Sequence, residues 1–318
     1  MITVDYLIEE TLKKKNPSVI GLDPDISRIP DCFKQNIFDQ NPLQATATVI
    51  EQWNRNIIDS IYDLVPAVKP QIAFYEKYGS YGIHALENTI QYAKEKGLLV
   101  IEDAKRNDIG NTAWAYAQAH LGKVETITEE KYSSVSVDFL TVSPFLGSEG
   151  LTPFIQICKS NGKGIFILVK TSNLGAQEIQ SALTAKGLTV SEYLASYIAG
   201  QADTSLGKYG YSAIGAVVGA TYPNENSALR KIMPKSYFLV PGYGAQGGTE
   251  QDVMTCFNSD GLGALINSSR EILFSHTTDI EQKNISKTDY CNRVREATKY
   301  MQEKIYFALK NTCPNMLY

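Results

Sequence analysis

The densest group of chemistry-bearing residues is the run Glu102–Gly110, which reads EDAKRNDIG. If this run ends a strand, side chains alternate, so Asp103 and Lys105 face one side and Glu102 faces the other. Asp103 and Asp108 should keep Lys105 protonated, because a nearby opposite charge favours the charged form. A protonated Lys105 suits a general acid better than an amine nucleophile, which needs a depressed pKa. A purely structural salt-bridge network is the alternative interpretation of the same pattern.

A second cluster is the glycine-rich run 241–248, which reads PGYGAQGG. It contains a formal match to the GxGxxG dinucleotide fingerprint, but that motif belongs in a first strand–helix unit with an acidic residue about 20 positions on. Here the run comes late in the chain, and the next apolar run leads to Arg270. Glycine-rich backbone followed by a permanently charged guanidinium favours a phosphate site. The alternative is a plain turn beside a surface arginine.

Metal sites and serine-nucleophile sites lack support in the sequence. The three histidines, His84, His120 and His276, include no pair at metal-ligand spacing, and we expect each to be structural or exposed. No GxSxG motif marks a serine nucleophile. Polar groups do follow several apolar runs, at Asp23, Lys69 and the TSN stretch 171–173. Polar groups after so many strand ends indicate a shared site.

Eight short apolar runs could be the strands that carry these groups, and helical patterns separate them. Continuous apolar runs are typical of parallel strands buried on both faces. Strands alternating with helices favour a closed (β/α)8 TIM barrel, whose site lies at the carboxyl ends of the strands; the alternative is a doubly wound sheet. The predicted strands are 19–22, 67–68, 98–101, 139–142, 164–169, 213–218, 237–240 and 263–266. The predicted helices include 45–64, 81–96, 111–120, 191–208, 226–232 and 289–309.

We expect one domain over residues 1–318, since no linker or low-complexity tract interrupts the chain. The first residues predict a helix at about 3–15, with Thr3 as its possible N-cap, and do not have the pattern of a signal peptide. The C-terminal helix is expected at about 289–309. The segment 174–188 is longer than a barrel connection requires, which makes it a candidate lid.

Composition limits the classes of partner. A formal net charge of −4 gives no electrostatic case for nucleic acid or an anionic membrane. No stretch approaches the roughly 18 apolar residues of a membrane span. The five cysteines are scattered without a CxxC motif, which is typical of reduced thiols in a cytoplasmic protein.

At the motifs the sequence resembles a known family. The run DAKRNDIG at 103–110 resembles the signature of orotidine 5′-monophosphate decarboxylases, and VKPQIAFYE at 68–76 resembles the lysine strand of one branch of that family. GLDPD at 21–25, the run 241–248 and Arg270 follow in the matching order. The resemblance implies a homodimeric barrel enzyme without metal or organic cofactor. The chain has no room for a fused orotate phosphoribosyltransferase, so we expect it to be monofunctional.

The resemblance also implies a role for each matching residue. Lys105 would protonate the carbon that loses CO2, Asp103 would press on the substrate carboxylate, and Lys69 would hold the ribose and the charge network. Asp108 would reach into the site of the partner subunit. The other implied substrate contacts are Asp23 at the ribose, Ile109 and Thr112 across the dimer, Ser172 at the pyrimidine (with Thr171 or Asn173 as substitutes), Gln246 and Arg270 at the phosphate, and Gln71 and Pro241.

Two other functions stay open on the residues alone. A metal-dependent sugar-phosphate lyase or synthase of the same barrel superfamily shares an Asp-x-Lys-x-x-Asp element. It would place a carboxylate where Lys69 stands, however, and an ammonium there would repel Mg²⁺. A non-catalytic protein that binds nucleotide phosphates would have no need of a costly buried array of lysines and aspartates.

Overall fold

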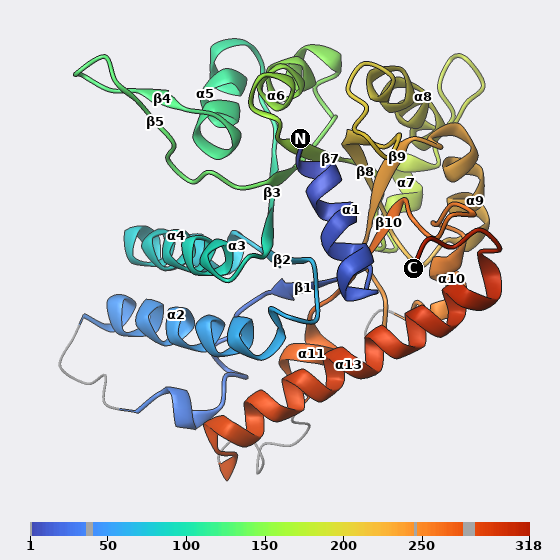
Figure 1. The fold of residues 1–318 in the computed structure, drawn as a ribbon. Coiled ribbons are helices and arrows are strands. Elements are labelled where there is room, and N and C mark those ends of the chain that lie inside the picture. Colours follow the sequence, from blue (N-terminus) through green and yellow to red (C-terminus); the bar gives the residue numbers. More distant parts are fainter. Residues whose placement is uncertain (1, 36–40, 245–246, 276–283) are drawn as a thin grey trace.

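The computed structural model describes residues 2–35, 41–244, 247–275 and 284–318. Eight parallel strands close into a barrel, in which the first strand pairs with both the second and the last (Figure 1). The TIM-barrel prediction is therefore confirmed, and the doubly wound sheet is excluded. The strands are β1 (Ser18–Leu22), β2 (Ala67–Pro70), β3 (Leu99–Arg106), β6 (Phe139–Val142), β7 (Gly164–Lys170), β8 (Ser212–Val218), β9 (Ser236–Val240) and β10 (Ala264–Ser268).

Each apolar run became a strand because the barrel and its helices bury both faces. Every residue of β1, β2, β6, β8, β9 and β10 is buried. Only β3 becomes exposed toward its carboxyl end, where the charged residues begin. The apolar part of each strand thus holds the barrel together, and its last residues are free to form a site.

Helices surround the barrel, as expected of alternating strands and helices (Figure 1). Most predicted bounds differ by a few residues at the ends. The longer helices are α1 (Thr3–Lys14), α2 (Pro42–Ile61), α4 (Gly79–Glu95), α5 (Gly110–Leu121), α6 (Ser148–Asn161), α8 (Val190–Ala202), α9 (Pro223–Ile232) and α13 (Lys287–Thr312). The shorter ones are η1 (Asp31–Phe33), α3 (Ala73–Glu76), α7 (Ala176–Gln180), α10 (Glu250–Met254) and α11 (Arg270–Leu273).

Two expectations about helices need correction, and one further helix was not named from the sequence. The helix predicted over 191–208 ends at Ala202, because the following residues form a turn that pairs Leu206 with Ser212. Helix α6 was not among the predicted helices, and Pro153 inside it interrupts the usual helical signal. Thr3 does not cap α1: the N-cap is Ile2, and the Thr3 hydroxyl donates to the carbonyl of Gly162 at 2.5 Å.

Helix α1 closes the amino-terminal end of the barrel. Its buried Val4, Leu7 and Ile8 pack in one cluster with the first residues of the strands, including Val19 and Phe139. Figure 1 shows this helix lying across the barrel. Because the amino-terminal end is filled in this way, the opposite end of the barrel is left for a functional site.

Two connections between barrel elements carry extra structure. Between α5 and β6 the chain forms a hairpin of β4 (Val124–Glu125) and β5 (Lys131–Tyr132), which was not predicted. The candidate lid 174–188 contains α7, and its Leu183 forms a bridge with Thr189, which directly follows the segment. Among the described residues, no helix is both long enough and apolar enough to cross a bilayer.

Candidate active site

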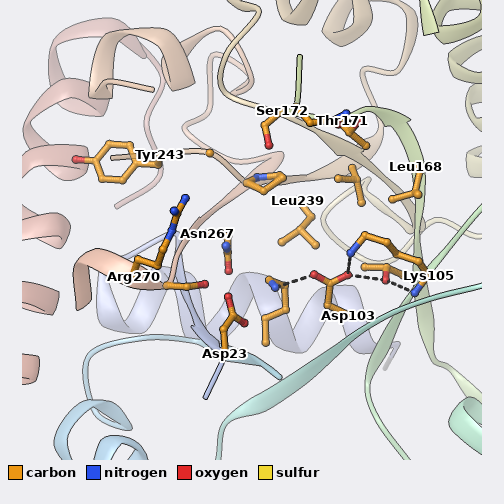
Figure 2. Close-up of a pocket in the computed structure, with 17 residues that line it drawn as sticks. Asp23, Asp103, Lys105, Leu168, Thr171, Ser172, Leu239, Tyr243, Asn267 and Arg270 are labelled. Atoms are coloured by element: carbon orange, nitrogen blue, oxygen red, sulfur yellow. Dashed lines mark hydrogen bonds and ion pairs between the residues drawn. The ribbon is translucent and has the colours of Figure 1, made fainter. Parts of the chain in front are cut away.

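The carboxyl ends of the strands enclose a cavity of about 310 Å³ (Figure 2). Residues from β2, β3, β6, β7, β8, β9 and β10 contribute to its walls, as expected for a barrel enzyme. The lining consists of Asp23, Lys69, Asp103, Lys105, Thr141, Leu168, Thr171, Ser172, Asn173, Val217, Leu239, Pro241, Gly242, Tyr243, Asn267, Ser269 and Arg270.

One end of the cavity holds a chain of charges centred on Asp103. Its two carboxylate oxygens accept hydrogen bonds from Lys69 Nζ at 2.9 Å and from Lys105 Nζ at 2.6 Å. The hydroxyl of Thr141 on β6 donates to the same carboxylate at 3.0 Å. The Lys69 side chain is 5% exposed and that of Asp103 13%, whereas that of Lys105 is 46% exposed. Lys105 is therefore the member of this charge array that is most open to the cavity.

The position of Lys105 depends on an irregularity in β3. Between Glu102 and Arg106 the register of β3 against β6 shifts, so four steps along β3 match two along its neighbour. Lys105 adopts a left-handed φ of 49°, which is uncommon for a residue with a side chain. Its backbone N–H donates to Thr141 Oγ1 at 2.9 Å. Such bulges redirect side chains at functional sites, and here Lys105 turns back onto Asp103.

Burial and charge act in opposite directions on the buried members of the array. Burial alone would raise the pKa of Asp103, but the ammonium groups of Lys69 and Lys105 outweigh it and hold that pKa far below its ordinary value. Burial would lower the pKa of Lys69, but Asp103 and Asp23 outweigh it and raise the pKa. Both groups are therefore charged at neutral pH.

The outward-facing neighbour of Asp103 connects the strand to the helix layer. Glu102 is fully buried, and its Oε2 lies 2.7 Å from Nδ1 of His120 on α5. The prediction that Glu102 faces the helices is confirmed, and His120, predicted to be either structural or exposed, is buried. This contact ties β3 to α5 behind the charge array.

At the opposite end of the cavity, several polar groups have no partner among the described residues. Arg270 begins α11 and is exposed, and within the described part of the chain its guanidinium makes no hydrogen bond or ion pair. Asp23 Oδ1 and Asn267 Oδ1 are buried, and each lacks a hydrogen-bond partner. Figure 2 shows Arg270 and Tyr243 on the side away from Lys105. Asn267 and Asp23 lie between Arg270 and Lys105. Buried polar atoms of this kind are usually satisfied by water or a ligand.

The glycine-rich run after β9 forms a tight turn beside Arg270. Gly242 and Gly244 have φ of 96° and 71°, values that residues other than glycine rarely adopt. The N–H of Gly244 donates to the carbonyl of Gly248 at 2.8 Å. Pro241, Gly242 and Tyr243 line the cavity, whereas Gln246 lies outside the described residues.

The residues just before the candidate lid form the wall above the charge array. Thr171, Ser172 and Asn173 all line the cavity, so each of the three considered from the sequence has access to a bound molecule. The Thr171 hydroxyl donates to Asn173 Oδ1 at 2.6 Å. In Figure 2 the side chain of Ser172 points into the cavity.

Four of the predicted site residues do not line the cavity of this single chain. Gln71 accepts a hydrogen bond from the backbone of Ala73 at 3.3 Å, at the start of α3. Asp108 accepts one from the backbone of its neighbour Ile109 at 2.8 Å. Ile109 and Thr112 are exposed at the start of α5. A site confined to one chain therefore excludes the loop that carries Asp108.

Sequence reasoning missed three polar residues of the cavity, Thr141, Asn267 and Ser269. Thr141 contacts both Asp103 and Lys105, and Asn267 places an unpartnered oxygen in the wall. Both lie near the carboxyl ends of predicted strands, so inward-facing positions there are the signal that could have found them. Among the described residues, no three histidine, cysteine or carboxylate side chains gather as a metal site would require.

Comparison with known proteins agrees with this arrangement. Residues 42–281 match the family model described as orotidine 5′-phosphate decarboxylase / HUMPS family. The orotidine 5′-phosphate decarboxylase of Rhodopirellula baltica is 40% identical over 92% of this chain and 95% of its own length. That of Caldicellulosiruptor saccharolyticus is 36% identical over 96% of this chain and 98% of its own.

A solved structure extends the likeness to three dimensions. The OMP decarboxylase of Leishmania donovani superposes with a TM-score of 0.71 at 27% identity, covering 98% of this chain and 99% of its own. The matched lengths leave little of either chain outside the comparison. This chain therefore belongs to the orotidine 5′-phosphate decarboxylase / HUMPS family.

Proposed function

We propose that this chain is a carboxy-lyase that converts orotidine 5′-monophosphate to uridine 5′-monophosphate and CO2 in pyrimidine biosynthesis. The observation that carries the proposal is the presence of the charge array at one end of the cavity and, at the other, of Arg270, whose guanidinium has no partner among the described residues. A nucleotide with a carboxylate on its base and a phosphate on its sugar has matching groups at its two ends. The named relatives act on this substrate.

In the reaction the bond from the ring carbon to the carboxylate breaks, and its electron pair stays on the ring carbon. Lys105 supplies the positive charge that stabilises this pair and then donates the proton that replaces CO2. An ammonium about 4 Å from the carbon contributes on the order of 4 kcal/mol at an effective dielectric constant near 20. Ionised Asp103 orients Lys105 and repels the substrate carboxylate, which is lost as CO2.

The charge of Lys105 alone cannot account for the rate enhancement of an enzyme, since enzymes lower activation free energies by about 8–23 kcal/mol. The remainder would come from binding energy at the phosphate, used to hold the reacting carbon against a preorganised array. Arg270 suits this role, because its planar fork binds a phosphate through two parallel hydrogen bonds. Gln246, predicted to share it, stays a prediction.

The ribose would lie between these ends. Asp23 and Asn267 each have a side-chain oxygen without a partner among the described residues, and these oxygens can accept hydrogen bonds from sugar hydroxyls. Lys69, already bonded to Asp103, has ammonium protons left for the same sugar. Ser172, or a neighbour in 171–173, would contact the pyrimidine, and Pro241 would pack beside it. Gln71 stays a predicted substrate contact, and it does not line the cavity.

The proposal includes a homodimer in which each site takes Asp108, Ile109 and Thr112 from the partner. The loop that carries Asp108 packs against the start of α6, where its carbonyl lies beside Gly150. Ile109 is exposed here, and so are Phe145 and Leu146 just before α6. Neighbouring exposed apolar side chains at the barrel rim support the proposed interface. A two-fold interface would carry Asp108 across to the second site.

The reaction is proposed to need no metal or organic cofactor. The lysine at the end of β2 forms an ion pair with Asp103, at the position where a metal-dependent lyase would hold Mg²⁺ with a carboxylate. A cytoplasmic location is inferred from the five cysteines, all of them described and all free thiols. The acidic balance of the chain argues against nucleic acid or a membrane as partner.

The direct test is the loss of substrate absorbance when the purified protein meets orotidine 5′-monophosphate in excess chelator. Turnover to uridine 5′-monophosphate and CO2 is the expected result, with Lys105→Ala protein as the matched control. Turnover that returns only with added Mg²⁺ would assign the chain to the metal-dependent lyases. Tight binding without turnover would assign it to the non-catalytic nucleotide-binding proteins.

A further inference from the structure

Lys170 is a buried charge that the reaction does not use. It is the last residue of β7, its side chain is fully buried, and it does not line the cavity. Its ammonium donates to Ser181 Oγ at 2.7 Å and pairs with Glu225 Oε2 at 2.8 Å. Removing an ammonium from water is costly, and burying an apolar residue here would avoid that cost. The position of Lys170 therefore calls for a role beyond packing.

One partner of Lys170 ties the strand to the neighbouring barrel unit. Glu225 lies in the first turn of α9, the helix that follows β8. The ring of Tyr222, just before that helix, lies 4.6 Å from the Lys170 ammonium. The Tyr222 hydroxyl donates to the carbonyl of Asn173 at 3.2 Å. Lys170 and the residues after it are thus held from the α9 side.

The other partner ties the strand to the middle of the lid segment 174–188. Ser181 directly follows α7, and the adjacent Gln180 accepts a hydrogen bond from the Thr171 backbone at 2.8 Å. Gln180 also donates to the Thr171 hydroxyl at 2.9 Å. Ser191 on α8 donates to the Gln180 carbonyl at 3.0 Å. The segment therefore folds back and fastens beside Lys170.

These contacts meet where the chain enters the cavity wall. Residues 171–173 follow Lys170 directly, and all three line the cavity above the charge array. We propose that Lys170 is a positioning residue, whose ammonium joins Ser181 and Glu225 so that residues 171–173 are held against the pyrimidine. This inference rests on the proposed function, since it names the base of the substrate.

The test compares two probes that differ only in the base. Uridine 5′-monophosphate and ribose 5-phosphate share the sugar phosphate, and calorimetry measures the binding of each. In Lys170→Met, which keeps a long side chain without charge, uridine 5′-monophosphate should bind about tenfold more weakly, the equivalent of one lost hydrogen bond. Ribose 5-phosphate should bind as it does to the wild type. Amide hydrogens of residues 171–181 should exchange faster.

Two further variants keep the test decisive if Lys170→Met does not fold. Glu225→Gln removes the counter-charge from a side chain that is 43% exposed, and should shift both readouts in the same direction. Glu178→Gln is the matched control: it removes a charge from α7, but among the described residues Glu178 forms no ion pair with Lys170. This variant should change neither the binding of uridine 5′-monophosphate nor the amide exchange.

Each outcome decides the inference. An equal loss of both probes would mean that Lys170 only supports the fold, and unchanged binding and exchange would mean that it positions nothing. A wild type that binds both probes equally, without turnover of the orotidine nucleotide, would refute the proposed function. Turnover by the wild type with no effect in the variants would refute the inference about Lys170 alone.

Discussion

The two ends of the cavity differ in how their polar groups are satisfied. At one end Lys69, Asp103 and Lys105 satisfy one another at 2.6–2.9 Å, and Thr141 adds a further contact. At the other end the described residues leave the Arg270 guanidinium unpaired, and Asp23 and Asn267 keep unpartnered oxygens.

The difference separates groups that react from groups that bind. Charges that must act on a developing carbanion work best when they are already in place, because no reorganisation is then needed during the reaction. Groups that bind substrate gain most when their partner arrives with it, because an already paired group would have to give up one contact for another. We call the end with Lys69, Asp103 and Lys105 the preassembled end of the cavity. We call the end with Asp23, Asn267 and Arg270, whose partners would arrive with the substrate, the waiting end.

Removal of Lys105 should produce the largest effect and test the preassembled end. Lys105→Ala deletes the charge and the proton donor, so kcat should fall at least about a thousandfold, the equivalent of the Coulomb energy of one nearby charge. Binding of uridine 5′-monophosphate should change little, because the waiting end is intact. Stopped-flow absorbance and calorimetry measure the two quantities.

Lys163→Ala serves as the matched control for Lys105. Lys163 pairs with Asp138 at 3.1 Å before β7, away from the cavity, and its loss should leave kcat unchanged. A Lys105→Ala enzyme that keeps a tenth of the wild-type kcat would contradict the role of Lys105 as proton donor.

Removal of Arg270 should produce the next largest effect and test the waiting end. Arg270→Ala should lower kcat/KM for the nucleotide about a hundredfold, since charged hydrogen bonds contribute about 1.5–3 kcal/mol each. The phosphate-free nucleoside orotidine should lose little, and added guanidinium should restore part of the nucleotide reaction. Equal losses on nucleotide and nucleoside would show that Arg270 supports only the structure.

The pH dependence of stability tests whether the array is preassembled in the free enzyme. The folded pKa of Asp103 lies below its unfolded value of about 3.9, so its ionised form stabilises the fold above that pH. This contribution is lost as the pH falls toward the folded pKa. The folded pKa of Lys69 is raised, so its contribution is complete below about pH 10 and is lost only as the pH rises through the folded pKa.

Asp103→Asn should therefore lower the free energy of unfolding by about 3 kcal/mol at neutral pH, the cost of breaking a buried ion pair. The difference from wild type should stay constant between about pH 5 and 9 and shrink below about pH 4. Urea unfolding at several pH values measures it. A difference that grows as the pH falls would contradict a depressed pKa for Asp103.

Subunit mixing gives the smallest expected signal and asks whether the preassembled end is complete within one chain. Lys105→Ala and Asp108→Asn homodimers should each be nearly inactive. After exchange, half the dimers are mixed and each has one intact site, so activity should return to about a quarter of wild type. No recovery, despite exchange shown by differently tagged chains, would mean that Asp108 serves its own chain.

The sequence was sufficient for the barrel because burial repeats along the chain. Each of the eight apolar runs became a strand, and the polar residue after it was placed at the carboxyl end without further information. The proximity of Asp103 to Lys105 and of Lys69 to Asp103 also followed from strand order. Family resemblance then supplied the substrate, which no periodicity could have shown.

Contacts between distant segments were decided only by the tertiary structure. Thr141 reaches Asp103 through the register of β6 against β3, and the bulge that turns Lys105 depends on the same register. Lys170 meets Ser181 and Glu225 only after the lid segment folds back beside α9. Local sequence indicates which segments form the buried strands, because hydrophobicity is a property of each residue. Which buried groups meet depends on how strands pair across the barrel, and that is a property of the whole chain.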